Sequence, residues 1–205
     1  MNDNIEFEAK FYPVDKNEYR KKLQQIGAKL LRSERKMNRV IADSRANSKI
    51  PKNDYLRVRD EGHLVRLSYK TTADNDGKLS DQKEVDVDVS DFDKTIKIIE
   101  LLGINFNRTQ ETLREEWKYK GAEITIDTWP GLDTYSEIEA ESEQVVKEIA
   151  AELGFDWDKK IITAAAEVYD RVYKIGIEEV LRKITNISFE NNPFEGLKKY
   201  ELEYN

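Results

Sequence analysis

Cysteine is absent from this 205-residue sequence, and histidine occurs once, at His63. The lack of cysteine excludes disulfides, thiolate metal sites and cysteine nucleophiles, and a single histidine excludes multi-histidine zinc sites. A bound metal would therefore have to be held by carboxylate oxygens, the ligands that Mg²⁺ and Mn²⁺ prefer. His63 itself falls in a predicted turn at 61–64, and we interpret it as a solvated residue rather than a catalytic base.

Long apolar runs and glycine-rich loops are also missing. No run approaches the ~18 residues needed to span a membrane, so we expect no membrane partner. Residues 1–4 lack the basic start and apolar centre of a signal peptide, which predicts a cytoplasmic protein. Because no glycine-rich phosphate loop is present, neither a P-loop nor a dinucleotide-binding site is supported.

Charge, in contrast, is plentiful. Lys and Arg number 34 and Asp and Glu 41, which gives a net charge of −7, and charged residues make up 37% of the chain. The usual share is about 25%. Net acidity disfavours bulk binding of nucleic acid. The length fits one domain with a hydrophobic core, so the excess of charged residues calls for a structural explanation within that domain.

Alternating polar and apolar residues predict a chain made mostly of strands. The strands are expected at 5–12, 28–32, 39–43, 55–60, 64–71, 83–89, 109–119, 122–129 and 135–141. Helices are expected at 15–26, where Asp15 and Glu18 form a capping box, at 90–102 with Ser90 as N-cap, at 143–153 and at 163–173. Hairpin-linked strands with helices at the interruptions indicate an antiparallel α+β fold and leave open whether the sheet closes into a barrel.

One face of these strands carries charges of both signs. Its members are Glu6, Glu8, Lys10, Arg57, Arg59, Arg66, Lys70, Glu84, Asp86, Asp88, Arg114, Asp127, Glu137 and Glu139. This could be the solvent face of an ordinary half-buried sheet. However, Glu, Asp and Lys are depleted in strands, and a barrel would instead bring these side chains together inside. There, Arg and Lys would suit phosphate oxygens and the carboxylates would suit Mg²⁺ or Mn²⁺.

The charged segments resemble a known family, the CYTH proteins or triphosphate tunnel metalloenzymes. Glu6-Phe7-Glu8-Ala9-Lys10 is an E-x-E-x-K strand, and the segments 56–59, 67–70, 83–86, 114–117, Asp127 and 137–139 follow in family order. The sequence looks most like the bacterial class IV adenylate cyclase-like branch. The resemblance implies an eight-stranded antiparallel closed β-tunnel with flanking helices over 1–175, followed by a tail at 176–205 of unknown role.

The resemblance also implies roles for the charged residues. Triphosphate would be bound by Lys10, Arg57, Arg59, Lys70, Lys83 and Arg114, to which strand alternation adds Arg66. Mg²⁺ or Mn²⁺ would be held by Glu6, Glu8, Glu84, Asp86, Asp127, Glu137 and Glu139. Glu6, Glu8 and Lys10 would be the catalytic residues.

Three positions depart from the family pattern. Lys83 replaces an arginine, which keeps the charge but loses the bidentate fork. Thr112 stands two residues before Arg114, where a second basic residue is common. The stretch 163–169 lacks the lysine that some triphosphatases carry there. These departures bear on the precise substrate and on catalytic efficiency rather than on the class of ligand.

The expected function is therefore metal-dependent hydrolysis of inorganic triphosphate or of a nucleoside or organic triphosphate. A class IV adenylate cyclase that converts ATP to cyclic AMP and pyrophosphate is the first alternative, and a non-catalytic polyphosphate- or nucleotide-binding module is the second. The partner is a small-molecule triphosphate, and the protein is a monomer or a homodimer.

The remaining aromatic and apolar residues are expected to be structural. The predicted core contains Trp117, Trp129 and Trp157 with Phe92, Ile96, Ile99 and Leu102. The tail residues Phe189, Phe194, Tyr200 and Tyr204 would either pack back on the barrel or contact a second subunit.

Overall fold

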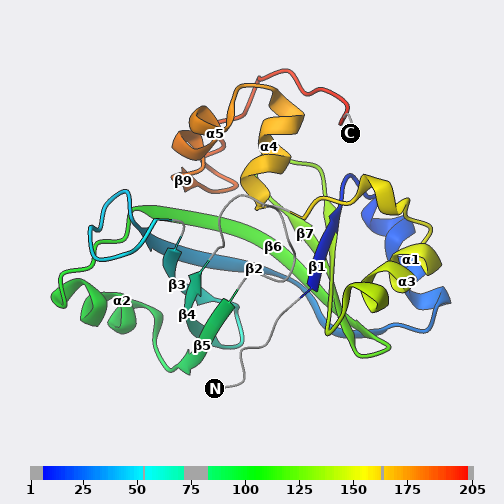
Figure 1. Ribbon diagram of the computed structural model, residues 1–205, viewed down its shortest axis with the longest axis horizontal. Helices are drawn as coiled ribbons and strands as arrows, with labels where there is room; N and C mark the ends of the chain where they lie inside the picture. Colours follow the sequence, from blue (N-terminus) through cyan, green and yellow to red (C-terminus); the bar gives the residue numbers. More distant parts are fainter. Residues whose placement is uncertain (1–6, 53, 72–82, 163, 203–205) are drawn as a thin grey trace.

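The computed structural model describes residues 7–52, 54–71, 83–162 and 164–202 (Figure 1). The strands are β1 Phe7–Phe11, β2 Lys29–Asp43, β3 Asp54–Asp60, β4 Val65–Thr71, β5 Lys83–Val89, β6 Arg108–Tyr119, β7 Ala122–Thr128, β8 Tyr135–Ala140 and β9 Asn186–Ile187. The helices are α1 Lys16–Gln25, α2 Phe92–Leu101, α3 Glu143–Glu152, α4 Ala165–Tyr173 and α5 Ile177–Lys183, with a 3-10 turn at Trp157–Lys159. The predicted α+β class is confirmed, and the predicted strands at 28–32 and 39–43 form one strand, β2.

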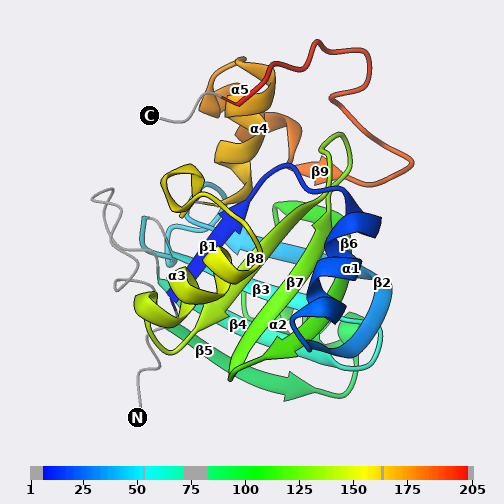
Figure 2. The ribbon, with the colours of Figure 1, turned by 90° about the vertical axis from the view of Figure 1, so that its right-hand side faces the viewer.

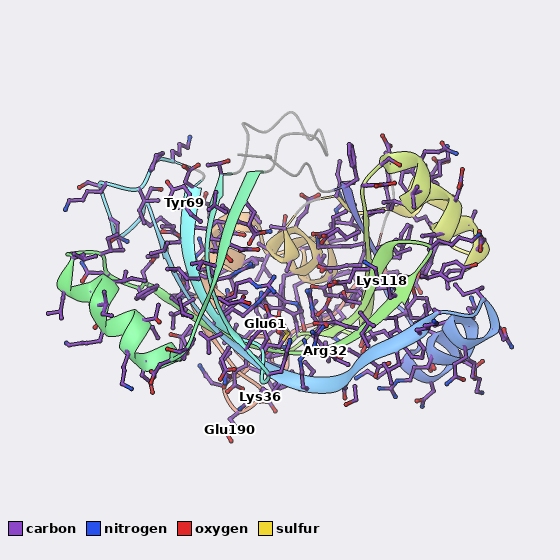
Figure 3. All side chains as sticks on the ribbon, turned by 90° about the horizontal axis from the view of Figure 1, so that it is seen from below. Arg32, Lys36, Glu61, Tyr69, Lys118 and Glu190 are labelled. Carbon is purple, nitrogen blue, oxygen red and sulfur yellow. The ribbon has the colours of Figure 1, made fainter. Side chains whose placement is uncertain are left out.

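The strands form a single sheet in the order β1-β8-β7-β6-β2-β3-β4-β5, and β9 pairs with β6. All neighbours on this path are antiparallel, whereas β9 is parallel to β6. Figure 3 shows the sheet bent into a U, with β3–β5 in one wall and β1, β7 and β8 in the other. In the part of the chain that the structure describes, no pairing joins β1 to β5, so the closed tunnel is not confirmed.

The outer face of one wall is apolar and is covered by α1 and α3 (Figure 2). This cluster joins Ala9, Phe11, Ile124, Ile126 and Ile138 of the strands to Tyr19, Leu23, Val146 and Ile149 of the helices. Residues of this outer face alternate with the charged ones along each strand, so burying them turns the charged side chains toward the inside of the U. We call that concave side the inner face.

The structure shows the Asp15 half of the capping box predicted for α1. The Asp15 side chain accepts hydrogen bonds from the backbone N–H groups of Asn17 and Glu18 at 3.0 and 2.9 Å. Such a cap satisfies donors that have no partner within the helix.

The prediction for α2 was partly wrong. Asp91 rather than Ser90 caps the helix, since its carboxylate accepts from the Lys94 N–H at 2.8 Å. Of its predicted core residues only Ile99 is buried, and Leu102 is 69% exposed. The helix is present as its spacing predicted, but it contacts the sheet at β3 and buries only Ile99 of its own residues. Of the tryptophans, Trp117 and Trp129 are buried and Trp157 is half-buried.

The C-terminal segment packs back on the sheet. Figure 1 shows α4 and α5 together at one end of the U. Val180, Ile184, Ile187 and Phe194 are buried in one cluster with Trp129 and Tyr169. Phe194 therefore packs back on the sheet, which was the first of the two expectations for the tail. Phe189 and Tyr200 are each 40% exposed, and Tyr204 lies outside the described residues.

Candidate functional site

Basic side chains from four strands share the inner face. They are Lys10 of β1, Arg57 and Arg59 of β3, Arg66 and Lys70 of β4, and Arg114 of β6. Lys10, Arg57 and Arg59 are 7, 8 and 9% exposed, far below the exposure of a lysine or arginine on a wet sheet face. The charged face of this sheet is therefore largely buried, which the solvent-face interpretation does not explain.

Carboxylates from the same face pair with these bases. Glu84 of β5 accepts from Arg57 Nη2 at 2.8 Å and also pairs with Lys70. Burial alone would favour the neutral acid, but Arg57 and Lys70 hold the pKa of Glu84 at about 2. The pairing explains how so many charges can be buried together, since each charge is compensated within the site.

A second paired group lies on the opposite wall. Arg114 donates to Asp127 through Nε at 2.7 Å and to Glu137 through Nη2 at 2.7 Å. Lys10 pairs with Glu8 and lies 3.5 Å from Glu137. Although burial favours the neutral acid, Lys10, Arg114 and other bases hold the pKa of Glu137 at about 2.

Charges on the two walls also influence one another. Lys70, on β4, contributes to the lowered pKa of Glu137, on β8. Burial lowers the pKa of Arg59 to about 10, and the charges of Arg57 on β3 and Arg114 on β6 both add to this effect. The inner face therefore acts as one electrostatic site rather than as separate ion pairs.

Some predicted residues lie at the margin of this site, and others are described only in part or fall outside the described residues. Glu6 falls outside the described residues, and of Lys83 the structure gives only its place at the start of β5, opposite Thr71. Asp86 accepts a hydrogen bond from Ser68, but its side chain is 35% exposed. Arg66, with a side chain 31% exposed, lies 3.7 Å from both Asp86 and Asp88 toward the β5 edge.

The structure also brings in two residues that the sequence did not single out. Arg39 of β2 is 8% exposed, and Glu61 is 4% exposed and accepts from Arg59 Nη2 at 2.6 Å. Figure 3 labels Glu61 inside the U. Arg39 could have been found from the predicted strand at 39–43, because Val40 and Ala42 alternate with it and point to the opposite face. Glu61 follows β3 in a predicted turn, so no periodicity marks it.

The oxygen ligands of the carboxylates and their positions in the strand register would suit a bound metal ion. Glu8 pairs with Glu139 across β1 and β8, and Glu139 pairs with Glu123 across β8 and β7. Like charges directly opposite one another are destabilising unless a cation lies between them. The donors are all oxygens, as Mg²⁺ and Mn²⁺ require. Within the described ranges, however, no three such groups converge closely enough to hold an ion, and Glu8 and Glu137 are neutralised by Lys10 and Arg114 instead.

The arrangement of the inner face suits a multiply charged anion. Several N–H donors of the basic residues point to carboxylates that an anion could replace, and three buried guanidinium Nε atoms, those of Arg39, Arg57 and Arg66, have no hydrogen-bond partner. Arginine forks match phosphate oxygens, and charge-assisted hydrogen bonds are about twice as strong as neutral ones.

Solved structures share this fold. A candidate adenylate cyclase from Vibrio parahaemolyticus superimposes with a TM-score of 0.68 at 12% identity, covering 80% of this chain and 97% of that one. A Pyrococcus horikoshii protein gives a TM-score of 0.62 at 25% identity, with coverage of 80% and 97%. A Pyrococcus furiosus protein gives 0.64 at 20% identity, with coverage of 78% and 96%.

Comparison with curated protein sequences finds no match. Among the described residues no helix has the length and apolar character to cross a membrane. The CYTH domain model matches residues 4–173, which include all the inner-face residues named above. The chain therefore belongs to the CYTH family.

Proposed function

We propose that this protein is a divalent-metal-dependent enzyme that hydrolyses a triphosphate on the inner face of its curved sheet. The observation that carries the proposal is that Lys10, Arg57 and Arg59 are buried, and Lys70 and Arg114 half-buried, on one face, from strands on both walls of the U. A linear anion with several charged phosphates is a ligand that can contact bases from both walls at once. Residues 1–175 would carry this function.

The basic residues would bind and orient the phosphates. Arg57, Arg59 and Arg114 would donate bidentate hydrogen bonds to phosphate oxygens, while Lys10 and Lys70 would act as point charges. Lys83 and Arg66 are proposed as outer members of the same set. Such preorganised donors stabilise charge that develops on the phosphoryl oxygens in the transition state.

Glu8, Asp127, Glu137 and Glu139 would hold Mg²⁺ or Mn²⁺, with Glu6, Glu84 and Asp86 as further acidic candidates. Once bound, the ion would neutralise and polarise the phosphoryl oxygens as a Lewis acid. Glu6 or Glu8 would orient a water whose oxygen attacks the terminal phosphorus, so that the bond from that phosphorus to the bridging oxygen breaks. Lys10 would neutralise the negative charge that develops on the bridging oxygen of the departing diphosphate.

Binding of the anion and of the metal would be coupled. In the free protein the bases and carboxylates neutralise one another, as in the Arg57–Glu84 pair at 2.8 Å. An anion that takes the bases leaves buried carboxylates without partners, which is costly unless a cation replaces the bases. The free energy of binding is therefore most favourable when both partners are present.

The same residues could support a cyclase. There, the 3′-hydroxyl of ATP would attack the α-phosphorus and pyrophosphate would leave. Hydrolysis is preferred because the sequence offers no element for recognising a nucleotide base. A module that binds the triphosphate without turnover is the remaining alternative.

Product analysis separates these activities. The purified protein is incubated with ATP or inorganic triphosphate and with Mg²⁺ or Mn²⁺, and phosphate, pyrophosphate and cyclic AMP are resolved. We expect free phosphate. Cyclic AMP with pyrophosphate and without phosphate would show the cyclase, and calorimetric binding without any product would show the binding module.

A matched pair of variants ties the activity to the inner face. Arg57→Gln removes a base from the inner face, whereas Arg20→Gln removes one from the outer face, where Arg20 pairs with Glu115 at 2.6 Å. Only Arg57→Gln should abolish the rise in melting temperature caused by triphosphate and metal, since a ligand stabilises the native state by an amount that grows with the ratio of its concentration to its Kd. Equal effects of the two substitutions would argue against the inner face as the site.

A further inference from the structure

Arg39 differs from the other basic residues of the inner face in its partners. Lys10, Arg57, Arg59, Arg66, Lys70 and Arg114 each lie within ion-pair distance of a carboxylate. Arg39 makes no such pair in the described part of the chain. Its Nη2 donates to Thr112 Oγ1 at 2.7 Å, and its Nε is buried without a hydrogen-bond partner.

Like charges dominate the surroundings of Arg39, and its own charge helps to lower the pKa of Glu137. Arg39 lies opposite Arg59 in the register of β2 and β3, and after burial the charges of Arg59, Arg57 and Arg114 lower its pKa to about 9. The guanidinium thus remains charged at neutral pH. A buried charge without an ion-pair partner among like charges destabilises the fold, so the presence of Arg39 at this position points to a ligand of opposite sign.

An aromatic platform holds Arg39 in this position. Its guanidinium carbon lies 4.8 Å from the centroid of the Trp129 ring. Trp129 in turn contacts the edge of Tyr169, whose hydroxyl donates to the Pro130 carbonyl at 2.6 Å. Stacking occupies one face of the guanidinium plane, while the N–H groups around its edge remain able to donate.

We propose that Arg39 is an additional anion-binding residue of the inner face, held in place by Thr112 and Trp129. This inference rests on the proposed function and adds a residue from β2 to its phosphate-binding set. Thr112 and Arg114 both lie on the inner face of β6, two residues apart. The hydrogen bond between Arg39 and Thr112 places the positive charge of Arg39 beside position 112, where the chain itself has an uncharged residue.

The contribution of Arg39 can be measured by calorimetric titration of the full-length protein with inorganic triphosphate in the presence of Mg²⁺. We expect Arg39→Gln to raise the Kd at least tenfold. The melting temperature without ligand should stay the same or rise, because the substitution removes an unpaired buried charge. Arg39→Met, which can pack against Trp129, should behave in the same way and serves as the second variant if the glutamine variant does not fold.

Thr112→Val tests the positioning role, since it removes the hydroxyl and keeps the charge of Arg39. It should raise the Kd by a smaller factor, and Thr112→Ser should restore the wild-type value. A purely structural Arg39 predicts the reverse pattern, in which Arg39→Gln lowers the melting temperature and Arg39→Met restores both stability and affinity.

The outcomes distinguish this inference from the proposed function. If the wild type binds triphosphate and both Arg39 variants bind it within twofold of wild type, the role of Arg39 is overturned and the proposed function stands. If the wild type does not bind triphosphate with either metal, both are overturned.

Discussion

Arg114 and Asp127 are register partners on β6 and β7, and they form a two-point ion pair. Arg114 Nε lies 2.7 Å from Asp127 Oδ1 and Nη2 lies 2.9 Å from Oδ2. Burial raises the pKa of Asp127 in spite of Arg114, whereas Asp127 and Glu137 raise the pKa of Arg114 well above its usual value in spite of burial. The geometry, which uses both carboxylate oxygens as acceptors, supports the ionised pair.

Breaking this pair should destabilise the fold. Asp127→Asn leaves a buried guanidinium with only Glu137 to compensate it, and removing one partner of a buried pair costs about 3–5 kcal/mol. Denaturant unfolding of the ligand-free protein measures the loss. As a control, Lys120→Gln breaks an exposed pair with Glu152 and should change the free energy of unfolding far less, because solvent screens that pair. A similar cost for both substitutions would mean that the buried pair is not stabilising.

Metal and triphosphate should each strengthen the binding of the other. We expect the Kd of inorganic triphosphate to rise at least tenfold when Mg²⁺ and Mn²⁺ are removed with a chelator, because the displaced carboxylates would then lack a cation. The same titration of Glu137→Gln should show a smaller dependence on metal. Equal affinity with and without metal in the wild type would contradict the coupling.

Gly131 should not tolerate a side chain. Its φ is +85°, and a Cβ there would lie 2.8 Å from Asn192 Oδ1 and 3.1 Å from Phe194 Cβ. Gly27, which follows the C-cap of α1, has a similar φ of +82° with no neighbouring atom within 4 Å of such a Cβ. Gly27→Ala should therefore cost only the strain of the left-handed conformation, about 1–2 kcal/mol, and Gly131→Ala should cost more. Chemical denaturation of both variants gives the difference, and equal costs would show that the tail can move away from the 129–132 turn.

Asp43 should give the protein a stability that depends on pH. Burial favours the neutral acid, but hydrogen bonds from Arg45 and Arg108 hold the pKa of Asp43 well below its usual range. A carboxyl group whose pKa is lowered in the folded state contributes stability above its unfolded pKa, about 3.9, and loses it as pH falls through the folded value.

The melting temperatures of the wild type and of Asp43→Asn between pH 7 and pH 2.5 test this effect. The wild type should have its full advantage above about pH 5, and the gap should narrow as the solution becomes more acidic. A gap that stays constant or widens on acidification would contradict the assignment.

Much of the fold could be predicted because alternation is a local property of the chain. The pattern along 5–12, with Phe7 and Ala9 apart from Glu8 and Lys10, assigns each residue to one of two faces without knowledge of any neighbouring strand. The same reasoning placed Arg57, Lys70 and Glu137 on one face, and the ends of most strands were predicted to within two residues. The order of the charged motifs was enough to indicate the family.

Alternation along one strand does not predict which strands, or which of their residues, contact one another. Arg39 lies near Arg59 and Thr112 because β2 pairs with both β3 and β6, and no local pattern specifies that register. Glu61 enters the site because β3 ends beside Arg35 and Arg66. The exposure of Leu102 likewise depends on where α2 meets the sheet.

The sequence by itself determined which residues share a face, which kinds of metal site the chain cannot form, and which family motifs are present, since these depend only on residue type and on spacing along the chain. The tertiary structure alone decided which charges neutralise one another, which arginine is left without a carboxylate, and how far the sheet closes. Those outcomes depend on the curvature of the sheet and on strand register, which arise from packing among segments far apart in the chain.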